Sequence, residues 1–397
     1  MTIATHRWPD NNFLSFNVTR LLGIVDFGGA DFTEIWGTCD RIDTKDLQSW
    51  HREWLRTAEA VEEHGRQAEA VGNWITARNA YQRACNYYRA AQLLLDPFGE
   101  EKIRLLEKLD EVFQKATRYF EVPPERISID YQGDMLPGYF FPALGRRDKR
   151  APTFLYVNGA DSLSSEVYFT VGRTFTEAGY NFMVFDQPGA GLTLARKKLP
   201  TRADAEVFVS PAVDYLLTRS DVDPKRLILI GESLAGYLVP RAVAFEKRLA
   251  AAVAYSPAYE VAVRTLFDGR LDKALAPYVL AVYGAKSVEE FLAGGPRFTY
   301  SLSGVLNKIE CPLLLIQGTE EKLMENPLSL HLQRLYEEAG SKSKKMVIIE
   351  PSPLGGTEHC QKDNLHLAHE HTLNWLCSLG LAPTPPAISA VPKAVQS

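Results

Sequence analysis

Short apolar segments that alternate with longer amphipathic segments fill the chain from about residue 120 onwards. Most of the apolar segments stop at Gly, Asp, Asn or Ser, as in APTFLYVNG, YNFMVFD, KRLILIG, LAAAVAYS, CPLLLIQG and KKMVIIE. Alternation of buried strands with helices predicts a mostly parallel sheet that helices cover on both faces. The segments ERISIDY and LPGYFFPA come first and indicate a strand pair, which gives an α/β fold with eight strands.

The chain before residue 120 has a helical pattern instead. Small and aromatic side chains recur there at steps of three and four residues, at Trp74, Ala77, Tyr81, Ala84 and Tyr88. This spacing is typical of an amphipathic helix that packs along one face. We therefore predict a helical N-terminal segment or cap over residues 1–119, followed by an α/β domain over residues 120–382. Residues 383–397 are rich in proline and small side chains and are expected to be disordered.

One connection is longer than a crossover between parallel strands requires, namely residues 257–310 between VAYS and CPLLLIQG. It follows the carboxyl end of a predicted strand, where ligands bind in open α/β sheets, so we expect a lid-like insertion. Its rings would suit an aromatic ligand, or they would form the core of the insertion itself. They are Tyr259, Phe267, Tyr278, Tyr283, Phe291, Phe298 and Tyr300.

The segment ILIGESLAGYLVP, residues 228–240, predicts a strand, a sharp turn and a helix, with Ser233 at the turn. It is close to the G-x-S-x-G pattern that holds a nucleophilic serine on a strained turn next to a base. Ala235 stands where that pattern has its second glycine, and Gly236 follows one residue late. A serine that only caps the following helix is the alternative interpretation of this stretch.

Two further strand ends supply the partners that such a serine needs. The segment LLLIQGTEEKL places Glu321 three residues after a strand-ending glycine, and the adjacent Glu320 is a second candidate for the acid. The segment KKMVIIEPSPLGGTEHC places His359 on the loop after the last predicted strand, where it would serve as the base. An oxyanion hole would use the backbone N–H groups of Leu234 and Ala160, with Asp161 as the alternative to Ala160.

Taken together, the motifs VNGADSLSSEVYF, VFDQPGAGLT, IGESLAGY, LIQGTEE and GTEHCQKDN resemble those of one branch of the α/β-hydrolases. This branch includes 2,6-dihydroxypseudooxynicotine hydrolase, the fungal hydrolases that shorten polyketide chains and the FrsA-type esterases. The resemblance covers residues 120–380 and implies an α/β-hydrolase fold. It also implies that Ser233, Glu321 and His359 form a catalytic triad.

The chain departs from this branch at two positions. Ala235 stands where a glycine is usual, and Glu321 stands where an aspartate is usual. The resemblance further implies an additional carboxylate in the pocket, for which Glu260 and Asp268 are candidates by position alone. Asp161 and Glu320 are further candidates for residues of the substrate pocket.

Composition and charge limit the partners, cofactors and cellular location that we expect. The formal net charge of -5 gives no reason to expect a nucleic acid or an anionic membrane as a partner. No apolar run approaches the roughly 20 residues that a membrane-spanning helix needs. The five cysteines are scattered without CxxC spacing, which favours reduced thiols in the cytoplasm and gives no indication of a zinc site. We expect no cofactor and no metal, and the sequence leaves a homodimer open.

These observations predict a serine hydrolase that cleaves an acyl C–C bond in a small aromatic or polyketide-like metabolite of secondary metabolism. A carboxylesterase or lactonase would use the same serine, and so would an acyl transferase or cyclase, so these alternatives stay open. A non-catalytic binding protein on a hydrolase scaffold is the alternative from another class of function.

Overall fold

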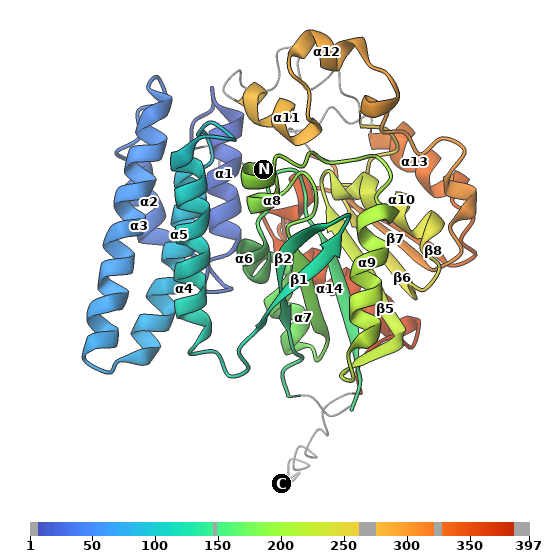
Figure 1. Cartoon of the computed structure of the whole chain (residues 1–397), viewed down its shortest axis with the longest axis horizontal. Helices are drawn as coiled ribbons and strands as arrows, with labels where there is room; N and C mark the ends of the chain where they lie inside the picture. Colours follow the sequence, from blue (N-terminus) through green and yellow to red (C-terminus); the bar gives the residue numbers. More distant parts are fainter. Residues whose placement is uncertain (1–6, 146–148, 262–274, 321–327, 385–397) are drawn as a thin grey trace.

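A single sheet of eight strands forms the centre of the structure (Figure 1). The structure, a computed structural model of the 397-residue chain, describes residues 7–145, 149–261, 275–320 and 328–384. The strands are β1 (Glu125–Tyr131), β2 (Asp134–Phe141), β3 (Ala151–Val157), β4 (Asn181–Phe185), β5 (Val222–Glu232), β6 (Ala251–Tyr255), β7 (Leu313–Gly318) and β8 (Lys344–Ile349). Their order across the sheet is β1-β2-β4-β3-β5-β6-β7-β8. Strand β2 pairs antiparallel with β1 and β4, and the other neighbours are parallel, as the sequence predicts.

The central strands are apolar along their whole length because the sheet is covered on both faces. Every residue of β3, β4, β6 and β7 is buried. The register sets Val157 of β3 beside Gly231 of β5, and Gly231 beside Ala254 of β6. The carboxyl ends of these neighbouring strands are therefore level, and the loops that follow them meet at one edge of the sheet.

Five helices at the start of the chain form a layer beside the sheet, in blue to teal in Figure 1. They are α1 (Asn12–Gly23), α2 (Phe32–Cys39), α3 (Leu47–Ala70), α4 (Trp74–Ala91) and α5 (Glu100–Thr117). The helices that follow in the chain are α6 (Ser164–Val167), the π-helical turn η1 (Tyr168–Gly172), α7 (Arg173–Glu177), α8 (Gly191–Lys197), α9 (Glu206–Thr218), α10 (Ala235–Phe245), α11 (Ala276–Tyr283), α12 (Val288–Ala293), α13 (Leu328–Glu338) and α14 (Leu365–Ser378). Within the described ranges, no helix is long and apolar enough to cross a membrane.

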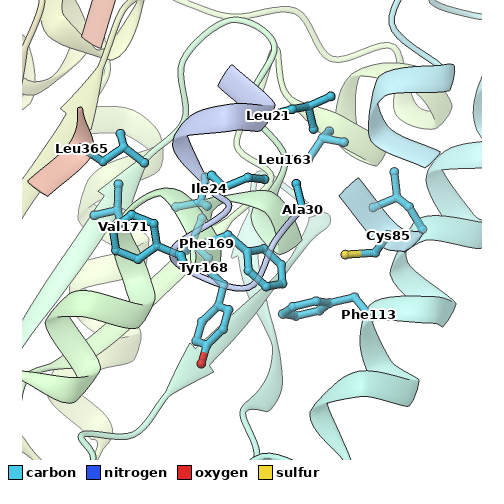
Figure 2. Close-up of a cluster of buried hydrophobic side chains, with 14 of the residues drawn as sticks. Leu21, Ile24, Ala30, Cys85, Phe113, Leu163, Tyr168, Phe169, Val171 and Leu365 are labelled. Carbon is cyan, nitrogen blue, oxygen red and sulfur yellow. The ribbon is translucent and has the colours of Figure 1, made fainter. Parts of the chain in front are cut away.

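The helical layer and the sheet share one hydrophobic core. Figure 2 shows Leu21 of α1, Ile24 directly after α1 and Phe113 of α5 around Tyr168 and Phe169, which follow β3. The ring of Phe113 lies 6.1 Å from that of Tyr168 and 6.0 Å from that of Phe169. The layer is thus packed onto the α/β part through aromatic contacts.

Two short helices of the insertion, α11 and α12, lie at one end of the sheet, at the top of Figure 1. The predicted insertion spans residues 257–310, of which 262–274 lie outside the described residues together with Phe267 and Asp268. Of its remaining rings, Tyr259, Phe291, Phe298 and Tyr300 are at most 8% exposed and belong to the hydrophobic cluster on the α10 side of the sheet. Most of the aromatic residues therefore form the core of the insertion.

One buried histidine lies where α14 packs against the segment after β3. His369 is 2% exposed, and its Nε2 donates to the carbonyl of Thr170 at 2.9 Å. The rings of Phe27 and Phe175 lie 5.7 and 5.4 Å from its ring. Burial lowers the pKa of His369 to about 3, so this imidazole is neutral in the folded protein at neutral pH.

We predict that His369 makes stability depend on pH. The unfolded chain takes up a proton on this side chain below a pH of about 6.5, whereas the folded protein does not until about pH 3. The free energy of unfolding therefore decreases on acidification across this window, by up to ~1.4 kcal/mol per pH unit. Urea unfolding at pH 7, 6 and 5 should show this slope in the wild type and a smaller slope in His369→Gln. The exposed His366 of the same helix provides the control His366→Gln, and an unchanged slope in His369→Gln would contradict the assignment.

Candidate active site

Ser233 occupies a strained turn between β5 and α10. Its φ angle is +60°, in the left-handed region that non-glycine residues rarely adopt. Its N–H donates to the carbonyl of Tyr255 at the end of β6, at 3.1 Å, and the residue is partly exposed. A strained strand-to-helix turn that exposes a serine is the geometry of a nucleophile elbow, and it differs from that of a helix-capping serine.

The departure from G-x-S-x-G has a direct packing explanation. A Cβ on Gly231 would lie 2.5 Å from the Cβ of Ala235, so the missing side chain at Gly231 makes room for the methyl group of Ala235. Gly236 is required for a different reason, because a Cβ there would lie 2.5 Å from the carbonyl oxygen of Ser256. The elbow therefore tolerates Ala235, while Gly231 and Gly236 keep the helix close to β5 and to the end of β6.

His359 stands on the loop after β8, in a short turn that follows Glu358. It is 6% exposed, and the ring of Phe16 from α1 packs edge-on against it at 5.8 Å. The next residue, Cys360, has a φ of +53°, and its N–H donates to Oγ of Ser256 at 2.8 Å. Ser256 itself has a φ of +47°. Residues with strained, left-handed backbone thus lie at the ends of β5 and β6 and on the loop that carries His359, and such residues are common at functional sites.

A cavity of about 140 Å³ at this edge of the sheet brings the predicted residues together. Ser233, His359, Leu234, Ala160 and Asp161 all line it. The opposite walls come from the helical layer and from the insertion, and they are mostly apolar. Their side chains are Phe13, Phe16 and Leu93 on one side and Leu275, Tyr278, Val279, Val282 and Tyr283 on the other.

The structure describes only one of the two candidates for the triad acid. Glu321 lies outside the described residues. The carboxylate of Glu320 accepts a hydrogen bond from the hydroxyl of Thr357 at 3.1 Å, and its N–H donates to the carbonyl of the same threonine at 3.0 Å. Glu320 therefore ties the loop after β7 to the loop that carries His359.

The two candidates for an additional pocket carboxylate are not brought to the cavity. Glu260 is exposed, forms an isolated backbone bridge with Ser301 and is not one of the residues that line the cavity. Asp268 lies outside the described residues. Among the described residues, no group of three His, Cys, Asp or Glu side chains could hold a metal ion.

The two proposed oxyanion donors, Leu234 and Ala160, line the same cavity as Ser233. Leu234 directly precedes α10, and the first N–H groups of a helix have no acceptor within it. Ala160 lies on the loop after β3, and the hydroxyl of Tyr278 donates to its carbonyl at 2.8 Å. This bond fixes the peptide between Ala160 and Asp161, so α11 helps to orient the loop.

Sequence reasoning missed the buried charges of the site. Glu232, inside the elbow, lies 2.7 Å from Nζ of Lys362, and each side chain is 4% exposed. Burial opposes ionisation of Glu232, but the coulombic effect of Lys362 lowers its pKa. This ion pair joins the serine elbow to the histidine loop. No local pattern relates these residues, because their contact links distant segments of the chain.

Comparison with solved structures identifies the fold. The structure of 2,6-dihydroxy-pseudo-oxynicotine hydrolase matches with a TM-score of 0.75 over 91% of this chain and 98% of that chain, at 20% sequence identity. The chain has the α/β-hydrolase fold. AbyA5 matches with a TM-score of 0.64 over 91% of this chain and 94% of that chain, at 16% identity.

Curated relatives with this α/β-hydrolase fold confirm the resemblance predicted from sequence. The chain is 33% identical over 255 residues to the α/β hydrolase xenA of Xenoacremonium sinensis, a match that covers 62% of this chain and 60% of the relative. It is 27% identical to the hydrolase ORFZ of Pyricularia oryzae over 94% of this chain and 97% of the relative. The chain thus spans about three fifths of the length of xenA, and no protein-family model matches it.

We predict that Gly231 and Ala235 are coupled. Gly231→Ala should destabilise the protein by about 1–3 kcal/mol, because the new methyl group overlaps that of Ala235. Gly231→Ala/Ala235→Gly removes this overlap and should recover part of the loss, although the carbonyl of Val157 would still lie 2.9 Å from the new Cβ. Denaturant unfolding of the two single variants and the double variant measures the coupling. A double variant no more stable than Gly231→Ala would show that the methyl contact does not matter.

Proposed function

We propose that this protein is a serine hydrolase in which Ser233 is the nucleophile and His359 the base. The observation that carries the proposal is the shared cavity, which holds a serine on a strained elbow and a buried histidine at one edge of the sheet. The name hydrolase, which the curated relatives carry, supports it. Glu321 is the proposed acid, since Glu320 already binds Thr357.

The proposed reaction begins when His359 takes the hydroxyl proton of Ser233 and Oγ bonds to a carbonyl carbon of the substrate. The N–H groups of Leu234 and of Ala160 or Asp161 would stabilise the negative oxygen that forms. The intermediate expels its leaving group, which takes the proton from His359, and leaves an acyl group on Ser233. Water, activated by His359, then releases this acyl group. Phe16 packs against the imidazole, so bulk water has little access to it.

For the substrate we propose a small aromatic or polyketide-like compound that is cleaved at an acyl C–C bond. The apolar walls and the rings of Phe13, Phe16, Tyr278 and Tyr283 suit such a compound. A cavity of ~150 Å³ is large enough for one benzene ring. The solved structure with a TM-score of 0.75 is named as a hydrolase of 2,6-dihydroxy-pseudo-oxynicotine, which fits this substrate class. A cytoplasmic location belongs to the same proposal, because all five cysteines are free thiols.

We expect Ser233→Ala to abolish covalent labelling by a fluorophosphonate, and to lower kcat by about 10³-fold or more. His359→Gln should slow labelling to a similar extent because the serine loses its base. Mass spectrometry of the labelled protein and of products from β-diketones, aryl ketones and aryl esters measures both effects.

The exposed Ser220 provides the matched control Ser220→Ala, which should label like the wild type. A wild-type protein that does not label would support a binding protein on a hydrolase scaffold. Turnover of aryl esters without any C–C cleavage would replace the proposed reaction by ester hydrolysis. Labelling without any turnover would favour acyl transfer.

The acid can be assigned with a second pair of variants. Glu321→Gln should lower the labelling rate by about 100-fold or more, because the imidazole loses the carboxylate that orients it. Glu320→Gln should lower it by less than about tenfold, because this side chain binds Thr357 instead. The reverse order of the two effects would assign the acid to Glu320.

A further inference from the structure

A cluster of four charged side chains joins the helical layer to the loop after β3. Arg20 of α1 and Arg89 of α4 each place a guanidinium nitrogen 2.8 Å from Oδ2 of Asp161. The same arginines contact Glu166 of α6, at 2.7 Å for Arg20 and 3.3 Å for Arg89. Arg20, Arg89 and Glu166 keep at most 4% of their side-chain surface exposed, whereas Asp161 keeps 34%. The cluster therefore holds Asp161 from one side only.

Asp161 lines the cavity that contains Ser233, and it also lines a second, smaller cavity together with Lys102 and Tyr278. Both arginines bind Oδ2, and among the described residues no group donates a hydrogen bond to Oδ1. Desolvation opposes ionisation of this carboxyl, but the coulombic effect of Arg20 and Arg89 keeps its pKa well below the usual range. Oδ1 can therefore accept a hydrogen bond from a ligand, and hydrogen bonds to a charged group are among the stronger ones.

The charge balance of the cluster indicates which donor fits. Its two guanidinium groups already match its two carboxylates, so a cationic ligand would add an unmatched charge to a buried site. A neutral O–H group donates a hydrogen bond without adding charge. Asp161 directly follows Ala160, whose N–H is a proposed oxyanion donor, so a bound hydroxyl would lie near the reacting carbonyl.

We propose that Oδ1 of Asp161 is a hydroxyl-binding subsite. It would select neutral aryl ketones or β-dicarbonyl compounds that carry a free hydroxyl group close to the carbonyl that Ser233 attacks. This inference rests on the proposed function, because it takes the carbonyl beside Ala160 as the reacting one. Asp161 holds the substrate, and His359 remains the group that moves the proton.

Protection of Ser233 against fluorophosphonate labelling tests the subsite without any turnover. The competing ligands are 2′-, 3′- and 4′-hydroxyacetophenone, each compared with its own methyl ether. In the wild type, at least one hydroxy isomer should protect at a concentration about 10- to 100-fold lower than its methyl ether, as expected for a hydrogen bond to a charged group. In Asp161→Asn this ratio should fall below about threefold, because the amide oxygen faces the two arginines and its NH₂ faces the cavity.

Two further variants separate the subsite from the ion cluster around it. Glu166→Gln removes one negative charge from the same cluster, but Glu166 does not line the cavity, so this control should keep the hydroxyl preference. Arg20→Met/Asp161→Leu keeps the cluster electrically neutral and should lose the preference. It provides the same comparison if Asp161→Asn does not fold.

Equal protection by every hydroxy compound and its methyl ether in the wild type would overturn the subsite. A preference that persists unchanged in Asp161→Asn would overturn it as well. Failure of the wild type to label would overturn the proposed function instead. The ligand pairs are then compared by calorimetric titration, which does not depend on a reactive Ser233 and decides on the subsite by the same ratios.

Discussion

Backbone-to-backbone contact at the carboxyl edge of the sheet fixes where Ser233 and His359 stand. A Cβ on Gly236 would lie 2.5 Å from the carbonyl oxygen of Ser256, and one on Gly318 would lie 2.2 Å from that of Thr357. At both places the chain approaches a neighbouring loop more closely than any side chain would allow. The end of β6 thereby touches the serine elbow, and the end of β7 touches the histidine loop. The strained backbone of Ser233 and Cys360 is held by this contact network, which explains how such strain persists.

Charged contacts extend this arrangement from the sheet edge to the helical layer. Lys362 and Glu232 join the two reactive loops, and Arg20 and Arg89 join α1 and α4 to the loop after β3. Buried ion pairs are poor sources of stability, since well-packed apolar groups often serve as well. Removing one partner alone is nevertheless costly, by about 3–5 kcal/mol, because the other charge remains buried. These ion pairs therefore mainly hold the elements in fixed positions relative to one another. The contacts of Arg20 hold α1 against the cavity in one defined position.

The parts of the candidate site that depend on local sequence patterns could be predicted from the sequence. Ser233 and His359 could be predicted because each follows a recognisable strand, and the turn residues around them constrain the backbone. Arg20 could not be predicted, because its role depends on a contact with Asp161 that no periodicity records. The insertion shows the same limit. Tyr278 and Tyr300 are the same residue type, yet Tyr278 lines the cavity while Tyr300 is buried in the core. The packing of irregular segments determines this difference, and the sequence pattern does not show it.

Different parts of the fold supply the two kinds of residue that line the cavity, namely those proposed to react and those that would contact the rest of a substrate. The proposed nucleophile, base and oxyanion donors all stand at or just after the ends of strands of the sheet. Phe13, Phe16 and Arg20 come from α1, and Tyr278 comes from α11, so most of the surface that faces a substrate belongs to elements outside the sheet. Substitutions of the apolar lining residues Phe13, Phe16 and Val279 would reshape this surface, whereas Arg20 and Tyr278 also hold the loop after β3. Fold alone does not specify a substrate. Under the proposed function, the helical layer and the insertion would determine which substrate binds, and Asp161 lies where that layer meets the edge of the sheet that carries Ser233.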